Sequence, residues 1–286
     1  MSNRNLLGLL GENINHSFSP LIFNSYFRKL NLNCSYYLFS ISKNSLSGFM
    51  KKLRNSLILG LNVTIPYKES VISCLDELDP IARKIFAINV IHNDKGKLTG
   101  YNTDYTGFKR ALRKYDHLNL ENAVILGAGG AARSVIYALY TLNFKKIVFF
   151  SRNRKRINRI MRDFYFIKVL KGHLWEEIKI KAEIRSSDVL INATPVGMFP
   201  DENKTPIEID FQLKDNFLVF DLIYNPRLTK FLKGAKNRGA LIENGINMLI
   251  FQAMESLKIW NREIINEELF IKNCEEVLNA SISNSW

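Results

Sequence analysis

The feature of this sequence that most constrains its fold is a strand, a glycine turn, a helix and a second strand in direct succession. The stretch reads NAVILGAGGAARSVIYALYTLNFKKIVFFS, residues 122–151. Both strand-like runs are apolar throughout, as in strands of a parallel sheet that helices cover on both faces. Further apolar runs at 188–194, 217–224 and 239–243 extend the pattern. The sequence therefore predicts a doubly wound, parallel-sheet nucleotide-binding domain of the Rossmann type.

The first hundred residues show a second α/β pattern. Short apolar runs at 6–11, 35–41 and 57–65 indicate strands, and helical spacing occurs at 20–30 and 79–86. We therefore expect an N-terminal α/β substrate domain with a mixed sheet. We set the substrate-binding and catalytic domain at 1–104, the nucleotide-binding domain at 105–245, and C-terminal helices that return to the substrate domain at 246–286, the last part ending in a Ser/Asn-rich tail.

Composition narrows the function classes. Lys and Arg total 40 against 27 Asp and Glu, a formal charge of +13. The cations are scattered, with no interleaved aromatic residues of a nucleic-acid module, so they favour small anionic ligands, with nucleic acid as the lesser alternative. The four histidines have no ligand spacing and predict no metal site. Three unpaired cysteines and the absence of a signal-like or membrane-length apolar run predict a cytoplasmic protein. Its oligomeric state, for which the sequence gives no signal, is expected to be a monomer or a homodimer.

The glycine turn GAGGAA is expected to bind phosphate. Gly127 would make the tight turn, Gly129 would let a pyrophosphate approach the backbone, and the following helix would offer its N–H groups. The predicted contacts here are Gly127, Ala128, Gly129, Gly130 and Ala131.

The end of the next strand predicts which dinucleotide binds. NAD enzymes commonly carry an acid there for the ribose 2′-hydroxyl, whereas this chain has SRNRKR at 151–156. Cations at a helix start oppose the helix dipole, which favours an anionic partner over a merely solvated helix face. We predict that Ser151, Arg152, Asn153 and Arg156 hold the 2′-phosphate of NADP.

Five stretches in order along the chain resemble the shikimate dehydrogenase family. They are HSFSP (16–20), NVTIPYKE (62–69), GYNTDYTG (100–107), INATPVGM (191–198) and GINMLIFQA (245–253). The resemblance implies NADP-dependent, reversible reduction of 3-dehydroshikimate to shikimate, a step of chorismate and aromatic amino acid biosynthesis.

The resemblance also implies residue roles. Lys68 and Asp104 match the family's catalytic pair, with an ordinary surface ion pair as the alternative. Ser17 and Ser19 match the loop that binds the substrate carboxylate, although Ser before Pro is also a common helix start. The other matched substrate residues are Asn62, Thr64, Asn89, Tyr224 and Gln252, and the matched cofactor residues are Asn192, Ala193, Thr194, Gly245 and Met248. For Met248, core packing is an equal alternative.

Five positions depart from the family pattern. In the predicted cofactor clamp, Ser151 and Asn153 stand where Asn and Thr are usual, while both arginines remain. Phe23 stands where a histidine is usual, removing a polar group that we expect near the site entrance. Phe86 replaces a glycine, which predicts a shifted backbone, and Val90 replaces a threonine behind Asn89. These changes keep two alternatives open: a quinate or quinate/shikimate dehydrogenase, and a non-catalytic nucleotide-binding homologue.

Overall fold

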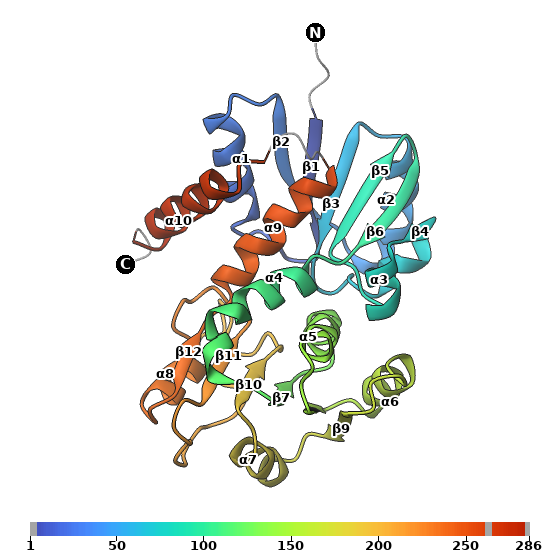
Figure 1. Cartoon of the computed structure of the whole chain (residues 1–286). Coiled ribbons are helices and arrows are strands. Elements are labelled where there is room, and N and C mark those ends of the chain that lie inside the picture. The colour runs from blue at the N-terminus through green and yellow to red at the C-terminus, as the bar shows by residue number, and fades with distance from the viewer. Residues whose placement is uncertain (1–4, 261–264, 284–286) are drawn as a thin grey trace. The chain divides into compact units, whose positions relative to one another are not determined.

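The structure, a computed structural model, describes residues 5–260 and 265–283. The last three residues of the Ser/Asn-rich tail lie outside the described residues. The chain divides into two compact units. Unit 1 comprises Met1–Thr103 and Ile250–Trp286, and unit 2 comprises Asp104–Leu249. Each unit has its own sheet (Figure 1).

The sheet of unit 1 is mixed, as the sequence predicts. Its strand order in the described residues is β2-β1-β3-β5-β6-β4. The first three strands are parallel, β5 runs antiparallel to both β3 and β6, and β4 is parallel to β6. The strands are β1 (Asn5–Gly11), β2 (Cys34–Ser40), β3 (Ile58–Val63), β4 (Glu77–Leu78), β5 (Val90–Asp94) and β6 (Lys97–Tyr101).

The helices of unit 1 bury apolar side chains spaced three and four residues apart. Helix α1 begins beside Pro20 and buries Ile22, Phe23, Tyr26 and Phe27. Phe23 stacks on Tyr36 with ring centroids 4.3 Å apart and is 1% exposed, so this departure from the family pattern changes the core rather than the site entrance. The helices are α1 (Ser19–Lys29), α2 (Leu46–Arg54), α3 (Pro80–Ile85), α10 (Glu267–Ser283) and the part of α9 (Ile246–Trp260) from Ile250 on, with 3₁₀ turns at η1 (Lys43–Ser45) and η2 (Ser70–Cys74).

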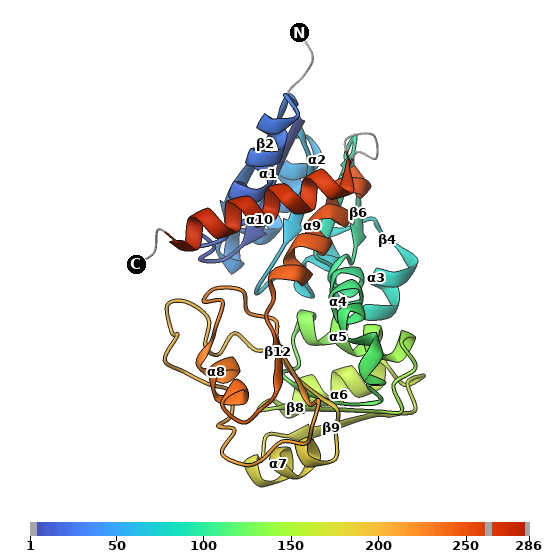
Figure 2. The ribbon, with the colours of Figure 1, turned by 60° about the vertical axis from the view of Figure 1, so that its left-hand side comes forward.

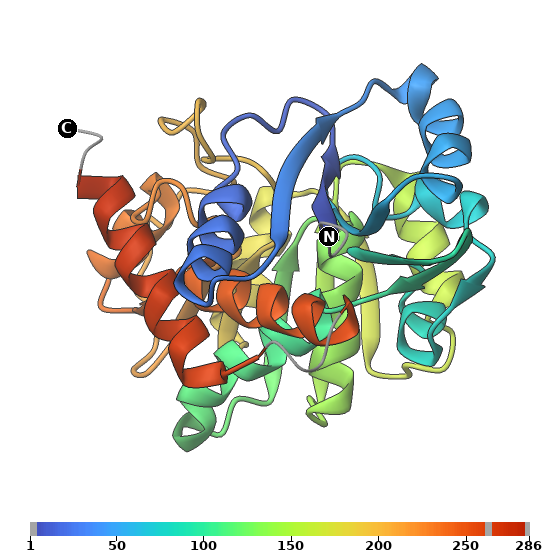
Figure 3. The same ribbon diagram turned by 90° about the horizontal axis from the view of Figure 1, so that it is seen from above.

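Helix α10 joins the N-terminal part of unit 1 although it comes last in the chain. Figures 2 and 3 show it beside α1 in both views. Ser25 Oγ donates to Asn273 Oδ1 at 2.9 Å, and the Tyr26 and Phe270 rings meet edge to face at 4.9 Å. These contacts fix the helix that carries Phe18 and Ser19 at its start.

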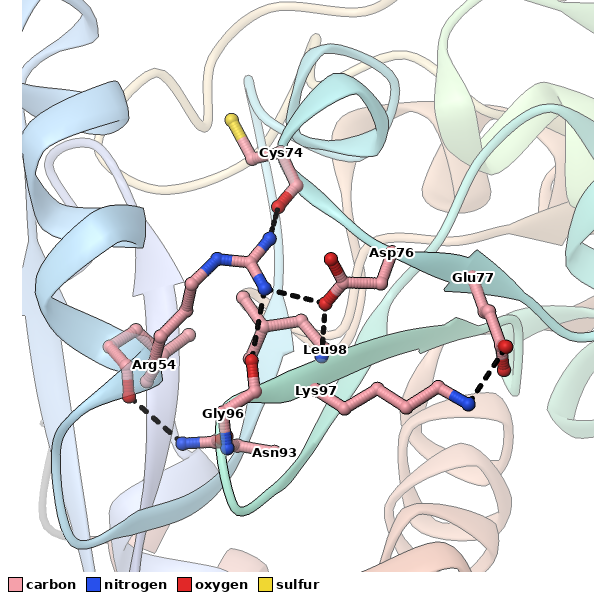
Figure 4. Close-up of polar contacts among 9 residues, drawn as sticks. Arg54, Cys74, Asp76, Glu77, Asn93, Gly96, Lys97 and Leu98 are labelled. Atoms are coloured by element: carbon pink, nitrogen blue, oxygen red, sulfur yellow. Dashed lines mark hydrogen bonds and ion pairs between the residues drawn. The ribbon is translucent and has the colours of Figure 1, made fainter.

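A polar network surrounds Arg54 at the end of the unit 1 sheet where β5 turns into β6 (Figure 4). The guanidinium donates to Asp76 Oδ2 at 2.5 Å and to the carbonyls of Gly96 and Cys74, both at 2.9 Å. Asp76 also accepts from the Leu98 N–H at 2.7 Å. Arg54 therefore ties α2 to the β5–β6 hairpin and the segment before β4, away from the predicted site residues.

The sheet of unit 2 is wholly parallel in the described residues, with strand order β12-β11-β10-β7-β8-β9. The order reverses direction between β7 and β10, which is the switch point of a doubly wound sheet and confirms the predicted fold class. The strands are β7 (Asn122–Leu126), β8 (Lys146–Ser151), β9 (Leu170–Leu174), β10 (Val189–Asn192), β11 (Leu218–Asp221) and β12 (Leu241–Glu243).

Helices cover this sheet on both sides. Figure 1 shows α5 and α6 on one face and α7 on the other, consistent with strands that are buried almost throughout. The segment after Thr103 is helical, so the units are not joined there by an extended linker. The helices are α4 (Asp104–Leu112), α5 (Gly130–Thr141), α6 (Arg154–Asp163), α7 (Glu177–Arg185), α8 (Lys230–Lys236) and the first turn of α9, with a 3₁₀ turn at η3 (Arg113–Leu118).

Candidate active site

In unit 2, the predicted phosphate turn lies at the switch point of the sheet. Gly127 follows β7 with φ +118°, and a Cβ there would lie 2.9 Å from the Ala193 carbonyl oxygen. The Gly127 N–H donates to the Phe150 carbonyl at 2.9 Å, and the Ala193 N–H donates to that of Leu126 at 2.8 Å. The loops after β7, β8 and β10 therefore converge, and only a residue without a side chain fits at Gly127.

The N-terminus of α5 fits a pyrophosphate. Its N-cap, Gly129, makes no side-chain capping bond, so the first N–H groups of the helix are not used by a cap. A Cβ built on Gly129 would find Arg156 Nη1 at 4.0 Å as its sole neighbour within that distance among the described residues. The space in front of the helix is thus open and bordered by a guanidinium, which suits an anion.

The predicted 2′-phosphate clamp lies around the start of α6. Ser151 ends β8, and its hydroxyl accepts the Asn153 N–H at 3.1 Å. Asn153 is the N-cap, accepting the Arg156 N–H at 3.2 Å, which is a structural task that the sequence analysis did not assign to it. The first turn of α6 contains no acid, so its cations do oppose the helix dipole as predicted.

Trp175 belongs to this region but was missed by the sequence analysis. The Arg152 guanidinium carbon lies 5.3 Å from the Trp175 ring centroid. The backbone N–H of Trp175 donates to the Ser151 carbonyl at 3.0 Å, which continues the β8–β9 pairing. A tryptophan 23 positions after Arg152 gives no periodic signal; the adjacency becomes visible only when the register of β8 and β9 is known.

The ends of β10 and β11 form one buried hydrogen-bonded group. Asn192 and Asp221 are register partners, and both are fully buried. Asn192 Nδ2 donates to Asp221 at 2.9 Å, while its Oδ1 accepts the Thr194 hydroxyl at 2.7 Å and the Thr194 N–H at 3.0 Å. Thr229 donates to the second Asp221 oxygen at 2.7 Å. Asn192 and Thr194, both predicted cofactor residues, are thus brought together, and Asp221 is a member of the group to which the sequence assigned no role.

Asp221 also holds the turn that leads to Tyr224. Its Oδ1 accepts the Ile223 N–H at 3.1 Å, and the Ile223 carbonyl accepts the Gly245 N–H at 2.9 Å. Tyr224 is half-buried, next to this bond in the chain. Met248 is 7% exposed, as expected of a side chain that packs in the core.

In unit 1, the two predicted carboxylate-binding serines point toward each other. Ser17 Oγ lies 3.2 Å from Ser19 Oγ and also accepts the Ser19 N–H at 3.2 Å. The helix N-cap is Phe18, without a side-chain capping bond, so neither serine is a standard N-cap. The hydroxyls form a compact pair at the start of α1.

The predicted amide residues of unit 1 meet in a buried polar cluster. Asn89 Nδ2 donates to Thr103 Oγ1 at 2.8 Å and to Gln252 Oε1 at 3.1 Å, and Asn89 Oδ1 accepts the Thr103 N–H at 2.6 Å. Asn62 accepts from the Tyr36 hydroxyl at 2.7 Å and donates to Ser256 at 2.9 Å. Asn62 also reaches the Asn89 carbonyl at 3.3 Å.

Thr103, Ser256 and Tyr36 had no predicted role, and they complete this cluster. Thr103 lies inside the quoted GYNTDYTG stretch, so its polar side chain beside Asp104 was a signal that the sequence offered. Tyr36 and Ser256 gave no such signal, because they come from β2 and α9, far from Asn62 in the sequence.

Lys68 is held next to the cluster through its backbone. Its carbonyl accepts the Ile88 N–H at 2.8 Å, one residue before Asn89. The Lys68 side chain and Thr64 are half-buried. Asp104 directly follows Thr103, is 4% exposed and begins α4, where the helix dipole favours a carboxylate.

Phe86 lies at the C-terminal end of α3. It caps α3 in the left-handed conformation, with φ 57° and ψ 32°, which a glycine adopts without strain. Its side chain is 43% exposed. Val90, by contrast, is fully buried in β5, and Asn89 donates hydrogen bonds to Thr103 and Gln252.

Two negative findings apply to residues 5–260 and 265–283. No helix there is long and apolar enough to cross a membrane. No group of three or more His, Cys, Asp or Glu side chains there could hold a metal ion.

Comparison with known proteins identifies the family. Residues 9–91 match the family model of the shikimate dehydrogenase substrate binding domain, and residues 109–229 match that of shikimate / quinate 5-dehydrogenase. A protein named shikimate dehydrogenase (NADP(+)) from Methanopyrus kandleri is 38% identical over 263 residues, which cover 91% of each chain.

Solved structures agree with the sequence relatives. Shikimate 5-dehydrogenase from Thermus thermophilus, in complex with NADP(H) and shikimate, has a TM-score of 0.80 at 28% identity, covering 96% of this chain and 99% of that one. Shikimate 5-dehydrogenase from Listeria monocytogenes, in complex with shikimate and NAD, has a TM-score of 0.82 at 30% identity. The match covers 95% of this chain and 96% of that one. The chain therefore belongs to the shikimate dehydrogenase family.

Proposed function

We propose that this chain is an NADP-dependent shikimate dehydrogenase, which reversibly reduces the 3-keto group of 3-dehydroshikimate to give shikimate, within chorismate and aromatic amino acid biosynthesis. The observation that carries the proposal is the polar cluster of unit 1, in which Asn62, Asn89, Thr103 and Gln252 lie together beside the backbone of Lys68. A polyhydroxylated ring needs several neutral donors and acceptors near one proton-transferring group.

Unit 2 supplies the cofactor site in this proposal. When bound, NADPH provides the hydride, and NADP⁺ accepts it in the reverse direction. The open N-terminus of α5 and the glycine turn would bind the pyrophosphate. The cations at the start of α6 would bind the 2′-phosphate. The proposed nicotinamide-side residues are Asn192, Ala193, Thr194, Gly245 and Met248.

The substrate roles rest on chemical fit. Ser17 and Ser19 present two hydroxyls 3.2 Å apart, suited to the two oxygens of a carboxylate. Asn62, Thr64, Asn89 and Gln252 would bind the ring hydroxyls, and Tyr224 would lie against the ring. Because the Asn62 and Asn89 amides already make several internal bonds, they are held in fixed orientations, which favours discrimination between hydroxyl patterns.

Lys68 and Asp104 are the proposed catalytic pair. Hydride addition at the carbonyl carbon leaves negative charge on the oxygen, and the Lys68 ammonium would donate a proton to that oxygen. In the oxidation of shikimate, the neutral amine would take the proton from the hydroxyl. Asp104 would bind the same hydroxyl and stabilise the ammonium form.

One observation favours quinate as a second substrate. The family model matched by residues 109–229 covers quinate as well as shikimate dehydrogenases. The substitutions at Phe86 and Val90 flank Asn89, a proposed hydroxyl-binding residue, so substrate preference is the property that they would change.

The test measures nicotinamide absorbance for the purified chain with shikimate or quinate, each with NADP⁺ or NAD⁺. We expect shikimate with NADP⁺ to give the highest kcat/KM. In Lys68→Ala, kcat should fall by about 10²-fold or more, because a general acid and base contributes about that factor. Lys84→Ala, which removes an exposed lysine of α3, is the matched control and should keep wild-type activity.

The outcomes separate the alternatives. Faster turnover of quinate would make the protein a quinate dehydrogenase and leave the role of Lys68 intact. Folded protein that binds NADP⁺ but turns over neither substrate would be a non-catalytic homologue. Full activity of Lys68→Ala would refute the assigned proton donor.

We further infer a cytoplasmic location, with the chain acting as a monomer or a homodimer. Cys34, Cys74 and Cys274 are all free thiols, which suits a reducing compartment.

A further inference from the structure

Trp175 is fixed against the start of the proposed 2′-phosphate clamp. It directly follows β9, an outer strand of the unit 2 sheet, and its N–H donates to the Ser151 carbonyl at 3.0 Å. Part of its ring packs on the apolar core that surrounds the sheet. The ring is therefore held by both a backbone hydrogen bond and core contacts, whereas the neighbouring Arg152 side chain is exposed.

Arg152 lies over this ring. Its guanidinium carbon is 5.3 Å from the ring centroid, within the range of a cation–π contact. In the described part of the chain, no ion pair within 4.0 Å engages Arg152. The ring face thus restricts a long side chain while leaving its N–H donors able to bind an anion. A side chain that is restricted before binding loses less conformational entropy when the ligand binds.

We propose that Trp175 is a positioning residue that orients Arg152 toward the 2′-phosphate, and that it thereby contributes to the preference of this chain for NADP over NAD. This inference rests on the proposed function, and it deepens it by naming a residue that sets cofactor selectivity. Trp175 acts through Arg152, so it should affect only ligands that carry the 2′-phosphate.

The experiment compares NADP⁺ and NAD⁺, which differ in that one phosphate. Calorimetric Kd values and steady-state KM values would be measured for Trp175→Leu, which removes the aromatic face, and for Trp175→Phe, which keeps a smaller one. Tyr165→Leu removes an aromatic side chain that is 74% exposed in the same unit and is the matched control. Thermal unfolding of each variant verifies that it is folded.

We expect the Kd for NADP⁺ to rise about three- to tenfold in Trp175→Leu, because the Arg152 side chain must then be ordered by the ligand on binding. The Kd for NAD⁺ should stay within about twofold of the wild-type value. The kcat at saturating NADP⁺ should not change, because the lost binding energy is the same in the ground state and the transition state. Trp175→Phe should lie closer to wild type. In an Arg152→Leu background, Trp175→Leu should have no further effect on NADP⁺ binding, because the contact that it removes is already gone.

Two results would overturn the inference. Equal weakening of NADP⁺ and NAD⁺ would mean that the ring contacts a part common to both cofactors. Unchanged NADP⁺ binding in Trp175→Leu would mean that Arg152 needs no support. Both results leave the proposed function standing, whereas failure of the wild-type chain to bind NADP⁺ would refute the proposed function together with this inference.

Discussion

Burial of Asp221 makes the stability of unit 2 depend on pH. The carboxyl is fully buried at the end of β11 and accepts hydrogen bonds from Asn192, Ile223 and Thr229. Loss of hydration disfavours its charged form more than these three neutral donors favour it. The balance raises the pKa of Asp221 to about 7, from an ordinary value of 3.8.

The direction of the effect follows from the proton balance. Between pH 4 and 7 the folded chain keeps the Asp221 proton that the unfolded chain has lost, so the free energy of unfolding falls as pH rises. The interval between 3.8 and about 7 corresponds to about 4 kcal/mol. The contribution is fully favourable below pH 4 and is lost as pH rises to about 7.

Asp221→Asn isolates this contribution. Asparagine retains the oxygen that accepts from Asn192 and Ile223, and its amide can donate to Thr229. The variant should match wild type within about 1 kcal/mol near pH 4, where both side chains are neutral. It should become the more stable protein by about 4 kcal/mol near pH 8.

The assay is urea unfolding of both proteins at one-unit steps from pH 4 to 8, with Asp215→Asn as the control for removing an exposed carboxylate from the same unit. Burial lowers the pKa of His92 and of His173, but both histidines are present in both proteins, so their contributions cancel in the difference. A stability difference that stays constant across the range, or that shifts in favour of wild type at high pH, would refute the reasoning.

Two further predictions concern packing. Gly245→Ala should destabilise the chain by about 3 kcal/mol or more, because the added Cβ would lie 2.1 Å from the Leu222 carbonyl oxygen. A fall of less than about 1 kcal/mol in the free energy of unfolding, measured with urea, would contradict this contact. Arg133→Met should cost about 1.5 to 3 kcal/mol, because it removes a charge-assisted contact of 2.8 Å with Asp163, which keeps its contact with Arg162 at 3.1 Å. Lys204→Ala breaks an exposed pair and should cost under about 0.5 kcal/mol, so similar losses in both variants would contradict the difference in burial.

Several parts of the site could be predicted because they depend on residues close together in the chain. The glycine turn between two apolar runs required a strand, a tight turn and a helix start whatever surrounded it, and β7, α5 and β8 lie there. The absence of acids after the second run likewise marked the cationic start of α6. The ordered motifs were enough to indicate the family, and the family models and relatives confirm it.

One expectation failed because the neighbours of the residue come from elsewhere in the chain. Phe23 was expected near the site entrance, but α1 turns it toward Tyr36 in the core. Tyr36 lies on β2, so this outcome does not depend on the residues adjacent to Phe23 alone.

The sequence by itself determined the α/β class, the glycine turn before α5, the cationic start of α6 and the family, since each depends on residue types at short, fixed spacings. Only the tertiary structure decided which side chains support them. Asn89 meets Gln252 from 163 positions away, Arg152 lies over Trp175, and Asp221 joins Asn192 to Thr229. The physical reason is that strand register and helix packing, which arise from burial of the whole apolar core, bring together polar groups whose separation along the chain carries no pattern.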